Sequence, residues 1–215
     1  MSGWWPVTLH ATHPNGTAVT LRPLRRRDRQ EWTALRADNA DWLHEWESTL
    51  PEPADRQLSF RGLVRLYHVE ASAGRMLPMA IEADGRLVGQ MHLFGIAWGS
   101  LRSGAIGYWI AESAAGRGLT PFALALLGDH AMRELGLHRI EVNIRPDNDA
   151  SLRVVEKLGF RDEGLRRHYL HINRAWHDHH TFALTTEDLA GGTLMGRLNR
   201  PSHQPLWRHT EQGPQ

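Results

Sequence analysis

Apolar positions recur along this chain with two different periods. An apolar residue at every second position predicts a strand, because successive side chains point to opposite faces, whereas a period near 3.6 predicts a helix with one apolar face. Strands are predicted at residues 17–24, 77–82, 86–94, 104–111, 138–144, 164–172 and 176–184. Helices are predicted at residues 29–46 (one or two, broken near Asp38–Asn39), 58–73, 119–135 and 150–158.

Turn and cap residues mark where several of these elements end. Asp84–Gly85 lies between two alternating runs and predicts a hairpin. Gly136 and Gly159 follow helical stretches, where a glycine commonly ends a helix, and Asp28 is positioned to cap the helix that starts at residue 29. The chain is therefore expected to form an α+β domain, with a mixed, mostly antiparallel central sheet of about six to seven strands flanked by about four to five helices.

Composition narrows the class of protein. The chain has 215 residues, of which 41% are hydrophobic and 23% charged, as expected for a globular domain with a buried core. It has no cysteine, which excludes disulfides, thiolate metal sites and a nucleophilic cysteine. We find no signal peptide and no apolar run long enough to span a bilayer, so we expect a cytoplasmic protein. Residues 1–188 are expected to form one domain, and residues 189–215, rich in glycine, proline, arginine and histidine, a flexible C-terminal tail.

Charge gives little support for a dedicated nucleic-acid binder. The formal net charge is +1, and such binders are usually strongly basic. The candidate basic patch consists of Arg22, Arg25, Arg26, Arg27 and Arg29. A solvated helix entry explains this cluster most simply, so we expect no stable nucleic-acid binding, although an RNA- or ribosome-associated module remains an alternative.

The first of two strand–helix junctions spans residues 108–122, YWIAESAAGRGLTPF. A strand ends there, a loop with Gly116, Arg117 and Gly118 follows, and an apolar helix begins with Pro121 in its first turn. The first turn of a helix has unpaired N–H groups and the positive end of the helix dipole, both of which suit a phosphate group. The loop lacks the endings of a P-loop or a dinucleotide-binding motif, so an ordinary tight turn is the alternative.

The second junction spans residues 141–160, EVNIRPDNDASLRVVEKLGF. A strand is followed by a polar turn and a short helix, in which Val155 and Leu158 face the core and Ser151 lies one turn earlier on the same face. Asn148 and Ser151 could each be no more than helix-capping residues.

In their order and spacing, the two junctions resemble the acetyl-CoA-binding core of the GNAT acetyltransferases. The phosphate loop of that superfamily runs Q/R-x-x-G-x-G/A, and Gly118 supplies its central glycine, whereas Ala115 and Thr120 depart from its outer positions. These departures remove one side-chain contact but keep the backbone amides. Segments 20–28 and 163–188 are similar to the RimJ/RimL-like branch, which acetylates N-terminal alanine or serine of ribosomal proteins, and the resemblance covers about residues 17–188.

The resemblance implies that acetyl-CoA is the cosubstrate and that a primary amine attacks the thioester directly, without an acyl-enzyme. The residues agree, because there is neither a cysteine nor a Ser–His–Asp arrangement to supply a nucleophile. The resemblance also implies that the glycine loop binds the pyrophosphate and that the end of the preceding strand binds the pantetheine arm and polarises the thioester. The cofactor-binding residues expected on this basis are Trp109, Ile110, Ala111, Arg117, Gly118, Leu119, Thr120 and Asn148.

Two residues are the predicted catalytic groups. Ser151 is expected to protonate the leaving thiolate, since Val155 stands where some relatives have a tyrosine. Glu141 is the first candidate for the general base, acting directly or through a water molecule. The structural alternative is that Glu141 pairs with an arginine. The other candidates for the base are Glu112, His168 and Tyr169, and the arginines that could pair with Glu141 are Arg139 and Arg145.

The acceptor is expected to be the N-terminal amine of a protein, with a ribosomal protein as the candidate. An α-amino group has a pKa of about 7.7–8.0, against about 10.4 for lysine, so roughly one N-terminus in seven is neutral at pH 7 and needs little help from a base. The alternatives are a small-molecule amine such as an aminoglycoside or polyamine, and a non-catalytic acetyl-CoA-binding regulator. We expect a monomer or homodimer.

The histidine-rich segment 177–180 does not predict a metal site. His177 and His179 share one face of the expected strand and His180 lies on the other, so the three cannot converge on one ion.

Overall fold

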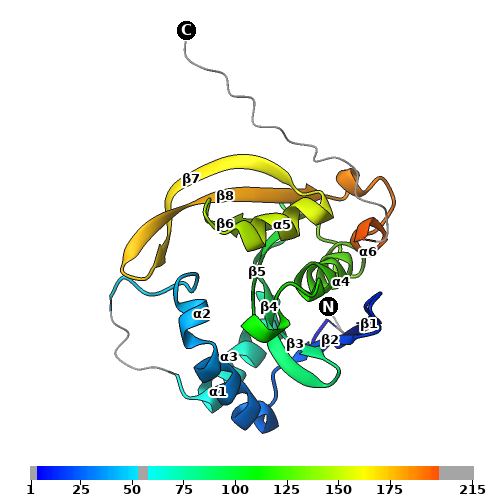
Figure 1. The fold of residues 1–215 in the computed structure, drawn as a ribbon. Helices are drawn as coiled ribbons and strands as arrows, with labels where there is room; N and C mark the ends of the chain where they lie inside the picture. The colour runs from blue at the N-terminus through cyan, green and yellow to red at the C-terminus, as the bar shows by residue number, and fades with distance from the viewer. Residues whose placement is uncertain (1–3, 53–57, 199–215) are drawn as a thin grey trace.

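In the part of the chain that the structure describes, one sheet of eight strands organises the fold, in the order β1-β2-β3-β4-β5-β6-β8-β7 (Figure 1). The computed structural model describes residues 4–52 and 58–198. Neighbouring strands are antiparallel except β5 and β6, which run parallel. The strands are β1 (Leu9–Thr12), β2 (Ala18–Pro23), β3 (Met76–Ala83), β4 (Arg86–Ala97), β5 (Ser103–Ile110), β6 (Arg139–Ile144), β7 (Arg161–Ile172) and β8 (Ala175–Thr185).

The predicted α+β class and the mostly antiparallel sheet are confirmed, with one strand and one helix more than expected among the described residues. The additional strand is β1, which pairs with β2 across a turn at residues 13–16. Two of its four residues are exposed and the other two only half-buried. Its sequence LHAT therefore lacks the clear apolar alternation from which a strand is predicted.

Helices cover both faces of the sheet. Those of the described residues are α1 (Arg29–Asp38), α2 (Ala40–His44), α3 (Phe60–Ser72), α4 (Leu119–Arg133), α5 (Asp149–Leu158) and α6 (Leu194–Leu198). Figure 1 shows α4, α5 and α6 grouped on the side of the strands away from α1 and α3. On the α1–α3 side, Trp32 and Tyr67 pack against a small core around Leu24 and Leu87. In the part of the chain that the structure describes, no helix is long and apolar enough to cross a membrane.

The predicted helix at residues 29–46 is broken where expected, at Asn39, which separates α1 from α2. The Asn39 side chain stabilises the break, because its Nδ2 donates to the Leu35 carbonyl at 2.8 Å and its Oδ1 accepts from the Glu112 amide at 2.8 Å. This second bond ties the α1–α2 corner to the segment just after β5.

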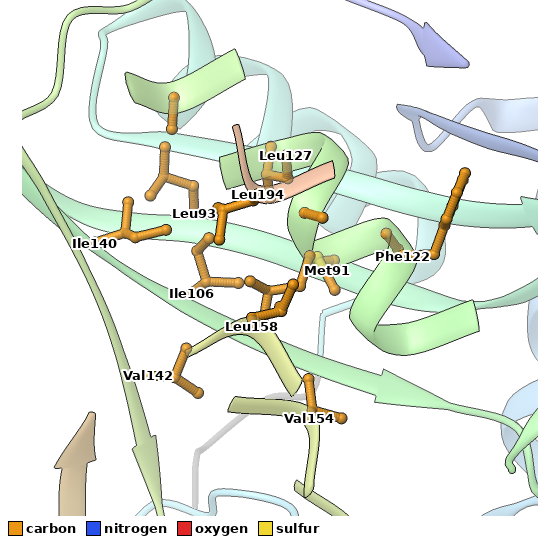
Figure 2. Close-up of a cluster of buried hydrophobic side chains, with 14 of the residues drawn as sticks. Met91, Leu93, Ile106, Phe122, Leu127, Ile140, Val142, Val154, Leu158 and Leu194 are labelled. Carbon is orange, nitrogen blue, oxygen red and sulfur yellow. The ribbon is translucent and has the colours of Figure 1, made fainter. Parts of the chain in front are cut away.

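The larger core lies between the sheet and α4 (Figure 2). Most residues of α4 are buried, which explains why this helix is apolar nearly all round. Residues Val154 and Leu158 place α5 on the same core, together with inward-facing side chains of the central strands. Those strand residues include Met91, Leu93, Ile106, Ile140 and Val142. The start of α4 is therefore fixed rigidly relative to β5.

Two expectations about the N-terminal region are wrong. Arg22 is not part of a surface patch, because it is 5% exposed and forms ion pairs with Asp28 at 2.7 Å and Glu82 at 2.5 Å. Asp28 stands at the N-cap position of α1, as expected, but its side chain does not cap the helix, because it bonds to Arg22 and to the amide of Arg25 instead. A buried guanidinium needs such partners, and this requirement takes precedence over the local cap.

The structure also differs from the expected tail over residues 189–198. Helix α6 packs on α4, with Leu194 fully buried against Gly128 and Ile140. Asp129 of α4 accepts hydrogen bonds from the amides of Leu194 and Met195 at 2.7 and 3.0 Å. These long-range contacts hold a short segment whose own sequence does not predict a packed helix. The rest of the predicted tail, 199–215, lies outside the described residues.

Candidate functional site

Strands β5 and β6 are joined only near their first residues. Their pairing covers three positions, from Ser103 with Arg139 to Ala105 with Glu141. Beyond these positions the remaining described residues of the two strands, up to Ile110 and Ile144, do not pair with each other. The backbone polar groups that face this gap are therefore available to a ligand, since they are not used in the sheet.

A cavity of about 460 Å³ lies in the gap. Its walls come from α1, α2 and α3, from strands β4 to β8 and from the first turn of α5. Tyr108 and Trp109 line it on β5, Asn143 and Ile144 on β6, and Ser151 on α5. The cavity thus adjoins both predicted strand–helix junctions.

The glycine loop between β5 and α4 has the features expected of a phosphate site. Gly118 is the N-cap of α4, with a left-handed φ of 77°, and no side chain caps the helix. Among the described residues, no acceptor is found for the amides of Arg117 to Thr120. These amides and the helix dipole can therefore bind an anion. The imidazole of His13 lies beside the loop, 3.1 Å from the position that a Cβ of residue 118 would occupy.

The residues that precede the loop are placed differently from one another. Trp109 lines the cavity and packs against Trp32, with ring centroids 5.3 Å apart. Ile110 lies at the end of β5, and its carbonyl accepts a hydrogen bond from the Trp42 indole at 3.0 Å. Ala111 is buried and its amide donates to the Val88 carbonyl at 2.7 Å. The amide of Ala111 is thus used within the fold and is not free for a ligand.

At the second junction, Asn148 is the N-cap of α5. Its Oδ1 accepts a hydrogen bond from the backbone amide of Ser151 at 3.0 Å, so Asn148 does cap the helix. Both side chains also line the cavity. Capping and ligand binding are therefore compatible, because the cap uses only one polar atom of Asn148 and only the backbone of Ser151.

Tyr108 faces Ser151, a juxtaposition that the sequence analysis did not identify. Burial raises the pKa of Tyr108 to about 12, and the nearby Ser151 side chain opposes this rise only in part. The Tyr108 hydroxyl is buried and has no hydrogen-bond partner of good geometry in the described residues. The cavity thus contains a phenol that stays protonated at neutral pH and is free to donate to a ligand beside Ser151.

Glu141 lies two residues before Asn143 on β6, but it does not line the cavity. Its carboxylate accepts hydrogen bonds from Arg139 at 2.8 Å and from Arg166 at 3.1 Å. Arg139 also pairs with Glu163 at 2.6 Å. This network agrees with the alternative in which Glu141 forms an ion pair with Arg139. The structure does not bring Glu141 together with Ser151 around one cavity.

The other candidates for the base are also separated. Glu112 lies in the turn after β5 and His168 on β7, and neither lines the cavity. Tyr169 does line it, and its ring lies 5.7 Å from that of His179. Among the described residues, no group of three histidine, aspartate or glutamate side chains is arranged to hold a metal ion.

The loop after α2 supplies part of the cavity wall. Ser48 forms an isolated β-bridge with Ile172, and the Thr49 amide donates to the His171 carbonyl at 2.9 Å. Glu47, which lines the cavity, accepts two hydrogen bonds from Arg36 at 2.7 and 2.6 Å. The loop is therefore anchored to β7 and encloses the cavity from this side.

Two further polar side chains of the cavity were missed because they lie in an otherwise apolar strand. Gln90 and His92 alternate on β4, and the Nε2 atom of each is buried without a hydrogen-bond partner in the described residues. Burial lowers the pKa of His92 to about 4, so its ring is neutral at pH 7. Two polar residues on one face of a buried strand could have identified this pair from the sequence. Buried polar groups usually have a hydrogen-bond partner, so polar side chains without one point to a ligand.

Comparison with known proteins places this geometry in a family context. Residues 18–161 match the model described as acetyltransferase (GNAT) domain. The chain is similar to the structure of Mycobacterium smegmatis RimJ in complex with CoA-disulfide, with 38% identity, a TM-score of 0.84 and coverage of 92% of this chain and 96% of that one. It is 32% identical over 175 residues to the Bacillus subtilis (strain 168) protein named Probable N-acetyltransferase YjcK, covering 80% of this chain and 97% of the relative. It is 30% identical over 181 residues to the [Ribosomal protein uS5]-alanine N-acetyltransferase of Escherichia coli (strain K12), covering 81% of this chain and 91% of the relative.

Proposed function

Because the chain belongs to the GNAT family and is an acetyl-CoA-dependent N-acetyltransferase, we propose that its acceptor is the N-terminal α-amine of a protein. A ribosomal protein with alanine or serine at its first position is the candidate acceptor. Acetyl-CoA and ribosomes are both found in the cytoplasm, where we place the reaction.

The similarity to RimJ carries this proposal. It covers 92% of this chain and 96% of that one, so it extends over almost the whole of both chains. The E. coli relative, by its name, acetylates the alanine of ribosomal protein uS5. The chemistry of an N-terminal amine agrees, since its pKa of about 7.7–8.0 makes fewer demands on a base than that of lysine.

Acetyl-CoA fits the residues at the start of α4 and along the gap between β5 and β6. The free amides of Arg117 to Thr120 would bind the pyrophosphate, and the unpaired edges of β5 and β6 would accommodate the pantetheine arm. Bound there, acetyl-CoA supplies a thioester as the acyl donor. We keep Trp109, Ile110 and Asn148 as proposed cofactor contacts. The amide of Ala111 is used within the fold, so Ala111 would contact the cofactor through its side chain or its carbonyl.

Proton donation to the leaving thiolate is assigned to Ser151 together with Tyr108. The two side chains lie together at the α5 side of the cavity, and the phenol stays protonated at neutral pH. A protonated hydroxyl beside the sulfur atom would supply the proton that the thiolate needs. Direct attack needs no protein nucleophile, in agreement with the absence of cysteine from the sequence.

The proposal predicts that peptides beginning with alanine or serine are acetylated at the N-terminus. CoA release should be measured with such peptides, with N-terminally blocked peptides that contain lysine, and with spermidine and an aminoglycoside, and mass spectrometry should locate the acetyl group. Preference for a lysine side chain or a small amine would contradict the N-terminal acceptor. Binding of acetyl-CoA without CoA release for any amine would instead favour a non-catalytic acetyl-CoA-binding regulator.

A further inference from the structure

The acceptor side of the cavity contains a histidine whose ring is fixed in one tautomer. His179 on β8 lines the cavity and is 3% exposed. Its Nδ1 lies 3.0 Å from the backbone carbonyl of His177. A carbonyl oxygen can only accept a hydrogen bond, so Nδ1 must carry the proton, and in the neutral ring Nε2 has a free lone pair.

The free nitrogen of His179 has no competing partner. In the segments that the structure describes, no hydrogen bond or ion pair is found for Nε2. The ring instead contacts Tyr169 edge to face, with centroids 5.7 Å apart. The carbonyl fixes the ring on one side and Tyr169 packs on another, so the imidazole is held in a defined orientation at the cavity wall.

Strand register places His179 at the open end of the gap. Asn143 of β6 pairs with Thr181, and their side chains are hydrogen-bonded at 2.8 Å. His179 is two residues from Thr181 and therefore lies on the same face of β8, beside the end of β6 where β5 has already diverged. Ser151 and Tyr108 line the same cavity from α5 and β5, so the cavity has a proton acceptor in one wall and proton donors in another.

We propose that His179 is the general base of the acetyl transfer, a role that rests on the proposed function. The nitrogen of the neutral amine forms a bond with the thioester carbonyl carbon, and the carbon–sulfur bond breaks. The proton lost by the amine goes to Nε2 of His179, and the thiolate takes a proton from Ser151 or Tyr108. One proton is taken up and one released, so the enzyme returns to its starting state by exchange with solvent.

The surroundings of His179 favour a neutral ring at pH 7, mainly because the ring is buried. Burial lowers the pKa of His179 below its usual value, while the hydrogen bond to the His177 carbonyl opposes this; Arg145 and the His177 side chain lower it further, and Asp147 raises it. Tyr169 faces the ring from β7. Across the cavity, the carboxylate of Glu47 is held by Arg36.

The remaining groups in the cavity are weaker candidates for this role. Glu47 already accepts two hydrogen bonds from Arg36. His92 has a pKa of about 4, so it accepts a proton much less readily. Glu141 lies outside the cavity and accepts from two arginines.

Two substitutions of His179 separate catalysis from structure. His179→Asn keeps an N–H group near the position of Nδ1, so that the bond to the His177 carbonyl can still form, but removes Nε2. His179→Gln places an amide near Nε2 that cannot act as a base. We expect both to lower kcat about 10²–10⁴-fold at pH 7, with acetyl-CoA affinity and Tm close to those of the unmodified protein. The deficit should shrink as the pH falls below the pKa of His179, because the protonated ring of the unmodified protein can then no longer accept a proton.

His177→Gln is the matched control, since the hydrogen bond between His179 and His177 is made by the backbone carbonyl of His177, and it should retain activity within about threefold. Recovery of full activity in His179→Asn would show a structural role and overturn the assignment, as would a deficit that does not change with pH. Full activity of both variants, together with a pH-dependent deficit in Glu141→Gln, would return the base role to Glu141. If the unmodified protein releases CoA with no amine, the proposed function itself fails, whatever the variants do.

Discussion

At the scale of single residues, Ser151 has two separable roles. Its backbone amide is bonded by Asn148 in the cap of α5, whereas its side chain lines the cavity beside Tyr108. A substitution at Ser151 that removes only the hydroxyl therefore leaves the cap in place. The side-chain roles of Ser151 and Tyr108 can be tested without disturbing the helix that positions them.

Ser151→Ala should lower kcat by about 10²-fold or more while acetyl-CoA affinity changes little, because a positioned proton donor is lost. Tyr108→Phe should behave similarly, and the double variant should be less impaired than the product of the two effects if the two hydroxyls act on the same proton. Steady-state kinetics measures kcat, and calorimetric titration measures the affinity for acetyl-CoA. As a control, Ser113→Ala alters an exposed serine outside this cavity and should be neutral. An unchanged kcat in Ser151→Ala would assign the donor role to Tyr108 or to water.

At the scale of elements, the start of α4 combines a backbone conformation with a helix terminus. Gly118 has a φ of 77°, which non-glycine residues rarely adopt, and its Cα lies close to His13. The conformation turns the chain so that the amides of Arg117 to Thr120 have no acceptor among the described residues at the helix start. Binding of pyrophosphate by these amides depends on the shape of the loop more than on any side chain.

Gly118→Val should weaken acetyl-CoA binding at least tenfold, since the added side chain strains the loop and meets His13. Calorimetric titration measures the affinity, and circular dichroism checks that the fold survives. Gly85→Val is the matched control, because Gly85 has the same φ of 77°, no atom lies within 4 Å of its added Cβ, and it lies in the β3–β4 turn. Equal losses of affinity in both variants would point to general destabilisation and contradict the pyrophosphate site.

At the scale of the whole molecule, α6 ties the C-terminal region to the core beneath the site. Arg197 donates to the carbonyls of Leu158 and Gly159 at the end of α5, at 2.8 and 3.2 Å. Leu194 fills the space above Gly128 of α4. Both helices that position the predicted cofactor site are therefore supported by residues beyond the predicted domain end at 188.

Leu194→Ala should lower the free energy of unfolding by about 2–5 kcal/mol, the range for a buried leucine that leaves a cavity. Urea denaturation measures this loss. The exposed Leu101, at 58% exposure, provides the control, since Leu101→Ala makes the same chemical change with an expected cost of less than about 0.5 kcal/mol. A Leu194→Ala variant as stable as the control would mean that the domain does not need α6, as the predicted boundary at 188 implies.

The sequence by itself determined the elements and the local chemistry of the two junctions. Periodicity located the seven longer strands and the break at Asn39, because these depend on which face of each element is apolar. The helix start at Gly118 and the cap at Asn148 also follow from local residue types. The family resemblance then identified acetyl-CoA as cosubstrate, in agreement with the comparisons.

Only the tertiary structure decided which polar residues meet. Glu141 and Asn143 share one face of β6. Glu141 is bonded to Arg139 and Arg166 and lies outside the cavity. Asn143 is bonded to Thr181 and lies in the cavity wall. Tyr108 and Ser151, 43 positions apart in the printed sequence, adjoin because β5 and β6 separate after three pairs. The free Nε2 of His179 follows from one backbone hydrogen bond. Periodicity specifies the face on which a side chain lies, but its partners across the sheet depend on strand order, register and ion pairing between segments far apart in the chain.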